Sequence, residues 1–487
     1  MTWMAAAIAI YLAAQLAIGL WVAPRIRSED DFLVAGRRLG LPLTTFSLFA
    51  TWFGAESVIA SSARTAERGI SLTTAEPFGY GLCLVVAGLV FAGPLWRRRL
   101  TTLADLFRVR YSEAVERTAA AIMIPTSLLW AAAQLRGFGH VLTTVVPLDV
   151  GAAIAVAAAF CIAYTTFGGL LADAITDLVQ GIVIVAGLAV LAIVVLVKQG
   201  GAAAVVAAAG AGRVSPAGGE GGMSALGVLE EWAIPVFGSV LAAELVSRLI
   251  AARSPQVART GALAAGGLYI AVGLLPVVVG LVGAGLVANL ADGEQFLPAV
   301  ARAVLHPAVY VMFAGALISA ILSTVDTVLL VAGGLASHNI VAPLAGVRDE
   351  RTRLRLTRGG VVVFGVIAWA IAARAGGVGE LVEQASALGS AGILVVAVFG
   401  LFTGFGGPAA AVLALLAATA TYLGAVAAEL PYPFLGSLAA SLGAFCLVGL
   451  VEARIRRAGS PPESPGRRPE QRPAAGSPAA PGFRPRS

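Results

Sequence analysis

The chain has 487 residues, of which 58% are hydrophobic and only 12% are charged, and its mean hydropathy is +0.88. A soluble protein needs far more charge to cover its surface, so this composition excludes a soluble multidomain protein. The net charge is +6, but the positive residues are spread over loops and a tail, so nucleic acid is not expected as a partner.

Apolar runs near twenty residues recur along the chain, and each is long enough to cross a bilayer as a helix. They lack the alternating pattern of a membrane barrel. The sequence therefore predicts an all-α membrane protein of about thirteen helices, a leader helix followed by core helices 1 to 10 and two trailing helices. The expected helices cover residues 5–22, 41–62, 78–95, 114–141, 147–165, 174–197, 228–250, 258–290, 297–333, 359–374, 380–402, 408–428 and 434–451.

Positive charge predicts the orientation of the chain. If the N-terminus lies outside, the inner loops and the tail carry 26 of the 33 Lys and Arg residues. This asymmetry follows the rule that cytoplasmic loops are rich in Lys and Arg. We therefore expect a multi-pass protein of the cell's inner membrane, surrounded by the lipid bilayer, with its N-terminus outside and its C-terminus in the cytoplasm.

Two predicted helices carry a Phe-Gly step beside polar residues at mid-span. In core helix 1 Gly54 lies between Thr51 and Glu56, and in core helix 6 Gly238 precedes Ser239. Paired interruptions are typical of inverted-repeat transporters, because a broken helix frees backbone groups to bind ions and substrate. Close helix packing at glycine is the alternative for either step alone.

Core helix 8 contains four hydroxyls and the carboxylate of Asp326 within residues 319–327. A carboxylate at mid-membrane costs about 2.5–3.5 kcal/mol on insertion scales, which points to a function. Hydroxyl and carbonyl oxygens suit a hard cation such as sodium. The alternative is that each Ser or Thr bonds to the preceding helical turn.

Core helix 5 begins with two carboxylates. Asp177 is a candidate for an ion path, with helix capping as the alternative. Asp173, one turn earlier, is expected to cap the helix or face water. His338, near the inner end of core helix 8, is expected to be water-exposed.

From residue 31 to about 451 the chain resembles the sodium/solute symporter family, most clearly over 31–37, 103–111, 164–180 and 320–324. The resemblance implies a leucine-transporter-type fold with two inverted five-helix repeats, and sodium as the co-transported ion. It also implies a sodium site between core helices 1 and 8, and puts Asp177 on the ion path or at a second sodium site. The implied sodium ligands are the carbonyls of Ala50, Phe53 and Ala320 and the hydroxyls of Ser323 and Thr324.

This resemblance divides the chain into six parts. These are a leader helix and cytoplasmic loop (1–40), the first repeat (41–197), a Gly/Ala-rich outer loop (198–227), the second repeat (228–402), two trailing helices (403–457) and a disordered Pro/Arg-rich tail (458–487). A tail of this composition cannot bury a core. No stretch is left for an added signalling domain, which argues against a sensor.

Within the family, the chain is most similar to the high-affinity choline transporter branch over 50–54, 77–81 and 129–133. The likeness implies a cage of Trp52, Tyr80 and Trp130 around a cationic head group, because ring quadrupoles attract a quaternary ammonium. Anchoring at the membrane interface is the alternative role for such aromatic residues.

The chain departs from that branch in core helix 6. Ala242 stands where a cage tryptophan is expected, and Glu244 follows it. With Glu56 and Glu76 near the same pocket, the acids favour a positively charged or zwitterionic solute, which Glu56 and Glu244 would contact. An ion pair with Arg248, four residues on, is the alternative role for Glu244.

The main hypothesis is sodium-coupled symport of a small organic solute by alternating access. The chain has no nucleophile pair, metal cluster or phosphate loop that would indicate an enzyme. The alternatives are a proton-coupled transporter of the same fold, with Asp177, Asp326 or Glu56 titrating, and a membrane solute sensor that does not transport. The sequence leaves open the solute, the stoichiometry and the oligomeric state.

Overall fold

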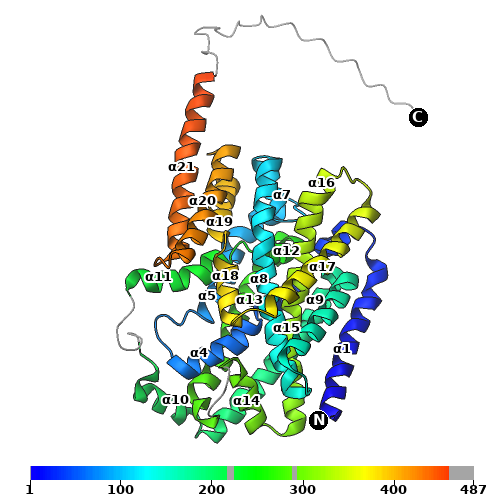
Figure 1. Ribbon diagram of the computed structural model, residues 1–487, viewed down its shortest axis with the longest axis vertical. Helices are drawn as coiled ribbons and strands as arrows, with labels where there is room; N and C mark the ends of the chain where they lie inside the picture. Colours follow the sequence, from blue (N-terminus) through cyan, green and yellow to red (C-terminus); the bar gives the residue numbers. More distant parts are fainter. Residues whose placement is uncertain (1, 216–223, 288–292, 460–487) are drawn as a thin grey trace, which may run out of the picture.

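The computed structural model describes residues 2–215, 224–287 and 293–459, and nearly all of these residues are helical (Figure 1). No strand occurs in the described ranges, where two isolated backbone bridges join Leu39 to Ala252 and Ile70 to Val214. The prediction of an all-α protein is therefore confirmed.

The α-helices are α1 (Thr2–Val22), α2 (Glu29–Val34), α3 (Leu41–Trp52), α4 (Ser61–Arg68), α5 (Phe78–Val86), α6 (Ala92–Arg97), α7 (Ala104–Arg110), α8 (Glu113–Val145), α9 (Val150–Lys198), α10 (Ala202–Ala208), α11 (Ala225–Ala233), α12 (Ala243–Ala251), α13 (Pro255–Gly283), α14 (Phe296–Val304), α15 (Pro307–Gly334), α16 (Ala342–Leu344), α17 (Glu350–Ala372), α18 (Val378–Ala387), α19 (Ser390–Phe402), α20 (Pro408–Ala427) and α21 (Pro433–Gly459). Short π-helical segments extend some of these helices, among them η3 (Glu56–Ala60), η6 (Ile234–Gly238) and η9 (Leu335–Val341).

Ten helices of the described part are long and apolar enough to cross a membrane, or twelve if each of two bent pairs is one span. The helix α9 is 49 residues long. At about 1.5 Å per residue it is more than twice as long as the hydrocarbon core of a bilayer is thick. It is therefore long enough for the two separate helices predicted over 147–165 and 174–197.

A bend at Gly169 divides α9 between those two predicted helices. Gly169 has φ +56° and ψ −178°, which an L-residue with a side chain rarely adopts. A Cβ atom at this position would also lie 2.8 Å from Cδ2 of Phe32 on α2. The glycine therefore lets the chain turn while α2 packs closely against the bend.

Two predicted helices are each divided in the structure. The predicted helix over 297–333 is α14 and α15, separated at Leu305 and His306, because the residue before Pro307 is disfavoured in a helix. The predicted helix over 380–402 is α18 and α19, separated at Gly389, where φ is +69°.

The predicted Gly/Ala-rich loop and the predicted Pro/Arg-rich tail lie partly outside the described residues. The Gly/Ala-rich loop over 198–227 contains the short helix α10, and its residues 216–223 are outside the description. The helix α21 continues to Gly459, and the rest of the predicted tail is outside the description as well.

The helices form a bundle with α15 at its centre and with α1 and α21 at its edges (Figure 1). All residues of α15 from Phe313 to Gly334 are buried. The start of α1, α4, α10 and α14 lie at one end, here called the N-terminal end. The opposite end holds α7, α16 and the end of α21.

Candidate functional site

The first break lies in core helix 1, where α3 and the η3–α4 segment meet at an angle of 61°. The amide of Gln134 on α8 holds the break together: its Oε1 accepts from the backbone N–H of Ala55 at 2.7 Å, and its Nε2 donates to Oε2 of Glu56 at 2.7 Å. The side chain of Gln134 thus satisfies a backbone donor that the interrupted helix leaves open.

The second break lies in core helix 6, where the α11–η6 segment and α12 meet at 40° across Ser239 to Ala242. Ser239 donates to Oγ of Ser386 on α18 at 3.2 Å, and the Tyr80 hydroxyl lies 3.0 Å from the same Oγ. Both predicted interruptions are therefore present, and side chains from neighbouring helices contact each of them.

The hydroxyl of Thr324 on α15 faces the break in α3. Its Oγ1 lies 3.5 Å from the carbonyl oxygen of Ala50, 2.9 Å from that of Thr51 and 3.3 Å from that of Ala320. Three of the five predicted sodium ligands therefore meet here, and the other two are their chain neighbours: Phe53 lies at the break and Ser323 next to Thr324. The carbonyl of Thr51 is an oxygen near this position that the sequence analysis did not single out.

Asp177 lies beside this set of oxygens and is fully buried. It accepts hydrogen bonds from Ser323 and, at 2.6 Å, from Ser47 on α3. The guanidinium of Arg248 on α12 lies 3.6 Å from Oδ2, the same oxygen that accepts from Ser47. Asp177 thus contacts both the predicted sodium ligand Ser323 and a fixed positive charge.

The surroundings of Arg248 correct two expectations. Its guanidinium pairs with Asp173 and also donates to Thr327, and neither Arg248 nor Asp173 is exposed to solvent. Asp173 therefore neither caps a helix nor faces water. Glu244 accepts a hydrogen bond from Ser127 at 2.5 Å, and no ion pair joins it to Arg248 in the described structure.

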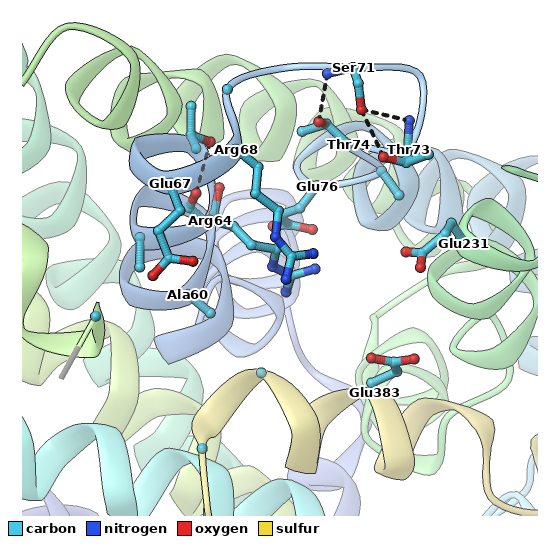
Figure 2. Close-up of a pocket in the computed structure, with 18 of the residues that line it drawn as sticks. Ala60, Arg64, Glu67, Arg68, Ser71, Thr73, Thr74, Glu76, Glu231 and Glu383 are labelled. Atoms are coloured by element: carbon cyan, nitrogen blue, oxygen red, sulfur yellow. Dashed lines mark hydrogen bonds between the residues drawn. The ribbon is translucent and has the colours of Figure 1, made fainter. Parts of the chain in front are cut away.

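A vestibule of about 530 Å³ opens at the N-terminal end of the bundle. Figure 2 shows Arg64 and Arg68 of α4 reaching into it beside Glu76, with Glu231 and Glu383 facing them from other helices. Its charged lining residues are Arg64, Arg68, Glu67, Glu76, Glu231, Glu294, Glu380 and Glu383. The excess of carboxylates makes the opening attractive to cations.

An inner cavity of about 50 Å³ adjoins the vestibule and shares with it Arg64, Glu76, Glu231 and Glu383. It reaches deeper, to the predicted substrate residues Glu56 and Tyr80. Glu56 begins the segment after the first break and lines this cavity, so the cavity extends to that break.

A third cavity, of about 30 Å³, contains the predicted substrate residues Trp130 and Glu244, together with Ser239 and Ser386 at the second break. Trp52 lines none of the three cavities. It is fully buried, and its ring packs edge-on against Trp130 with centroids 5.0 Å apart. Four of the five predicted substrate residues are therefore divided between two cavities, on the two sides of the hydrogen bond between Tyr80 and Ser386, and the fifth, Trp52, lines neither.

Sequence reasoning missed Gln134 and the inward position of Arg248. Gln134 is one polar residue in a run of alanines, and only its contact with Ala55 and Glu56 gives it a role. Arg248 lies near the end of predicted core helix 6, among the positive charges assigned to an inner loop at 248–260, yet its side chain is 0% exposed. The two acids Asp173 and Asp177 in a membrane helix could have predicted a buried positive partner, because buried charges need partners.

The sequence pattern of the Sodium:solute symporter family matches residues 32–405. A high-affinity choline transporter of Drosophila melanogaster is 30% identical over 180 residues, which are 36% of this chain and 29% of that relative. The corresponding transporter of Caenorhabditis elegans is 25% identical over 403 residues, which are 74% of this chain and 67% of that relative. The chain thus spans less than a third of the first of these relatives in its match and two thirds of the second.

A solved structure of a Na⁺-coupled sialic acid symporter, in a substrate-bound outward-open state, superimposes with a TM-score of 0.81. The superposition covers 92% of this chain and 98% of that chain at 16% identity. A nucleobase-cation-symport-1 family transporter gives a TM-score of 0.58, also at 16% identity, over 89% of this chain and 96% of that one. These likenesses confirm the predicted leucine-transporter-type fold.

Proposed function

Because the chain belongs to the Sodium:solute symporter family, we propose that it is a transporter, not an enzyme, and carries a small organic solute together with sodium by alternating access. The observation that carries the proposal is the position of Thr324. Its hydroxyl lies within 3.5 Å of carbonyl oxygens of both α3 and α15, at the break in α3. A cluster of neutral oxygens between two helices suits sodium, a hard cation.

In this proposal sodium is held by five oxygen donors, the carbonyls of Ala50, Phe53 and Ala320 and the hydroxyls of Ser323 and Thr324. Sodium would join α3 to α15 and so favour the conformation in which the vestibule is open. A solute that binds the same conformation is then coupled to sodium, because each ligand raises the population that the other needs.

Asp177 has a supporting role in the proposal. It holds the hydroxyl of Ser323 and lies next to Arg248. Its carboxylate would therefore orient a sodium ligand. It would also bind sodium transiently as the ion enters or leaves the site. A second sodium site at Asp177 would require Arg248 to move away from it.

The proposed solute is cationic or zwitterionic. The inner cavity that reaches Glu56 and Tyr80 has four carboxylates and one guanidinium in its lining. The relatives described above include choline transporters, and choline is a cation. Trp130 and Glu244 line the neighbouring cavity, which the solute would enter after the hydrogen bond between Tyr80 and Ser386 opens.

The proposed orientation places the N-terminal end of the bundle and its vestibule outside the cell. The opposite end carries the arginine-rich segments at 97–110 and 348–358. Such segments favour the cytoplasmic side of a bacterial-type inner membrane. The vestibule would then receive solute and sodium from outside.

The test is the thermal stability of the purified protein in 100 mM sodium chloride against 100 mM potassium chloride. Binding stabilises a protein by about 1.4 kcal/mol when the ligand is tenfold above its dissociation constant. We expect sodium to raise the melting temperature of the unaltered protein, and Thr324→Val or Ser323→Ala to abolish that increase.

The matched control is Thr419→Ala in α20, because the Thr419 hydroxyl donates to the preceding turn, at the carbonyl of Leu415, and has no other hydrogen-bond partner in the described part of the chain. This variant should keep the full sodium effect. A double variant of Ser323 and Thr324 that still responds to sodium would exclude the site. Solute uptake driven by a pH gradient without sodium would favour the proton-coupled alternative instead.

A further inference from the structure

Two carboxylates of the inner cavity each have one oxygen held by the protein. Oε2 of Glu56 accepts from Gln134 at 2.7 Å, and Oε1 of Glu76 accepts from the Tyr269 hydroxyl at 2.5 Å. That hydroxyl also lies 2.5 Å from Oγ of Ser57. Both carboxylates are thus fixed in orientation, one from η3 and the other from the segment before α5.

The second oxygen of each carboxylate is buried and has no hydrogen-bond partner within the described residues. These atoms are Oε1 of Glu56 and Oε2 of Glu76, and both residues line the inner cavity. A buried carboxylate oxygen without a donor costs free energy, more than a neutral group does. A ligand that brings N–H donors into the cavity would remove this cost.

A quaternary ammonium cannot meet that need, because it has no N–H group. It is held instead by the faces of several aromatic rings. Among the described residues, Tyr80 is the one aromatic residue in the lining of the inner cavity, and the ring of Trp52 lies outside it, fully buried. The inner cavity therefore favours a cation with N–H donors, since hydrogen bonds between ionised groups are strong and directional.

A second pair of carboxylates lies where the inner cavity meets the vestibule. Glu231 on α11 and Glu383 on α18 line both spaces and face Arg64 across the opening (Figure 2). Arg64 is the one positive residue that the described part of the chain contributes to the lining of the inner cavity. Glu56 lines the inner cavity and not the vestibule, whereas Glu76, Glu231 and Glu383 line both. Four carboxylates spread over this path, against one guanidinium, match a ligand with a positive charge at each end.

We propose that the solute is a short primary diamine, with one ammonium group on Glu56 and Glu76 and the other facing Glu231 and Glu383. This inference rests on the proposed function and gives its solute a chemical class. Three N–H donors on each ammonium can satisfy both free carboxylate oxygens at once. The chain between the two groups would lie against the apolar wall of Ile234, Pro235 and Val382.

The test is a calorimetric titration of the purified full-length protein in 100 mM sodium chloride. The probes are 1,4-diaminobutane, its fully N-methylated analogue, 1-aminobutane and choline. We expect the diamine to bind at least tenfold more tightly than each of the other three. Glu56→Gln and Glu76→Gln should each weaken diamine binding by tenfold to a hundredfold, because each removes a charge-assisted hydrogen bond.

The matched control is Glu67→Gln, because Glu67 lines the vestibule and not the inner cavity. Its diamine affinity should stay within threefold of that of the unaltered protein. Tight binding of the N-methylated analogue or of choline, equal binding of 1-aminobutane, or full diamine affinity in both Gln variants would each overturn the inference.

The sodium effect on thermal stability separates the two proposals. Each variant must keep that effect, which shows that it is folded and that its sodium site is intact. A protein that responds to sodium but does not prefer the diamine would overturn the inference and leave the proposed function standing. A protein without any sodium response would overturn the proposed function itself.

Discussion

At the scale of single residues, Arg248 is a fully buried cation with acidic partners on another helix. Its side chain is 0% exposed, and its guanidinium contacts Asp173, Asp177 and Thr327. Two buried carboxylates beside one guanidinium are stable only while all three groups stay together. Arg248 therefore joins α12, which follows the second break, to α9 and α15.

We expect Arg248→Ala to lower the free energy of unfolding by about 3–5 kcal/mol, because it leaves two buried carboxylates without a positive partner. The measurement is thermal or denaturant unfolding of the purified protein, followed by tryptophan fluorescence. Arg248→Lys should lower the free energy of unfolding by less than Arg248→Ala does, since it keeps the charge but not the planar donors.

The control for this prediction is a second substitution. Adding Asp173→Asn to Arg248→Ala removes one of the unpaired charges and should restore part of the lost stability. Arg248→Ala with unchanged stability, or no recovery in the double variant, would mean that Arg248 does not neutralise these acids.

At the scale of elements, close approaches at glycine shape the two breaks. A Cβ atom on Gly238 would lie 2.4 Å from the carbonyl oxygen of Ser386 on α18. A Cβ atom on Gly54 would lie 2.6 Å from Oε1 of Gln134. At both breaks the absence of a side chain lets a neighbouring helix reach the interrupted backbone.

We expect Gly238→Ala to destabilise the protein by about 1–3 kcal/mol, as overpacking does, because the clash is with backbone and no side chain can swing aside. The shift of α18 should also weaken solute binding more than sodium binding. Thermal stability and titration of the solute and of sodium measure these effects.

The control is Gly315→Ala in α15, where an added Cβ meets no atom within 4 Å. Helix propensity favours Ala over Gly, so this variant should be as stable as the unaltered protein or slightly more so. Equal behaviour of the two variants would mean that the space at Gly238 is not needed.

At the scale of the whole molecule, the two ends of the bundle differ. The N-terminal end holds the open vestibule. The opposite end is closed by an end cluster, which we define as Glu29, Asp105, Glu116, His338 and Asn339. These residues come from α2, α7, α8 and η9. An open end and a closed end are what alternating access requires of one conformation.

The contacts of the end cluster are short and continuous. The His338 ring lies 2.8 Å from Glu29 and 3.2 Å from Asp105. Asn339 donates to Asp105 at 3.1 Å and to Glu116 at 2.7 Å. His338 is therefore not a water-exposed residue, contrary to the expectation from the sequence. Opening this end of the bundle would break these contacts.

Asp105 has a lowered pKa within the end cluster. Burial by itself would raise its pKa, but the hydrogen bond and charge of His338 and the backbone N–H groups of Thr102 and Thr101 outweigh burial and hold the pKa at about 2. Because this pKa is below that of an unfolded aspartate, the stabilisation is complete above about pH 4 and is lost as the pH falls toward 2.

We expect Asp105→Asn to lower the free energy of unfolding by about 2 kcal/mol at pH 7, because the pKa of Asp105 is held at about 2, below that of an unfolded aspartate. The difference from the unaltered protein should persist at pH 5 and shrink at pH 3. Thermal unfolding at the three pH values measures it, and hydrogen exchange should show faster opening of residues 101–110.

The control is Glu113→Gln, because the ion pair of Glu113 with Arg117 lies on the surface, with Glu113 69% exposed. A surface pair adds little stability, so this variant should behave like the unaltered protein at each pH. Equal effects of the two substitutions would show that the end cluster does not hold this end closed.

The features that could be predicted from the sequence all lie within single helices. The apolar runs, the Phe-Gly steps at 54 and 238, and the hydroxyls of Ser323 and Thr324 are set by composition and by spacing along one helix. Sites that need several helices were predicted less completely. Trp52, Tyr80 and Trp130 were expected around one pocket, but Tyr80 and Trp130 line different cavities, and Trp52 lines none of the three cavities described above.

The sequence by itself determined that this chain is a bundle of membrane helices with two interrupted ones, because hydropathy and turn-forming residues act locally. Only the tertiary structure decided that Arg248 meets Asp173, that Gln134 bridges Ala55 and Glu56, and that His338 joins Glu29 to Asp105. The partners in each contact are between 75 and 309 residues apart along the chain. Such pairs are chosen by helix packing, which no local pattern of residues specifies.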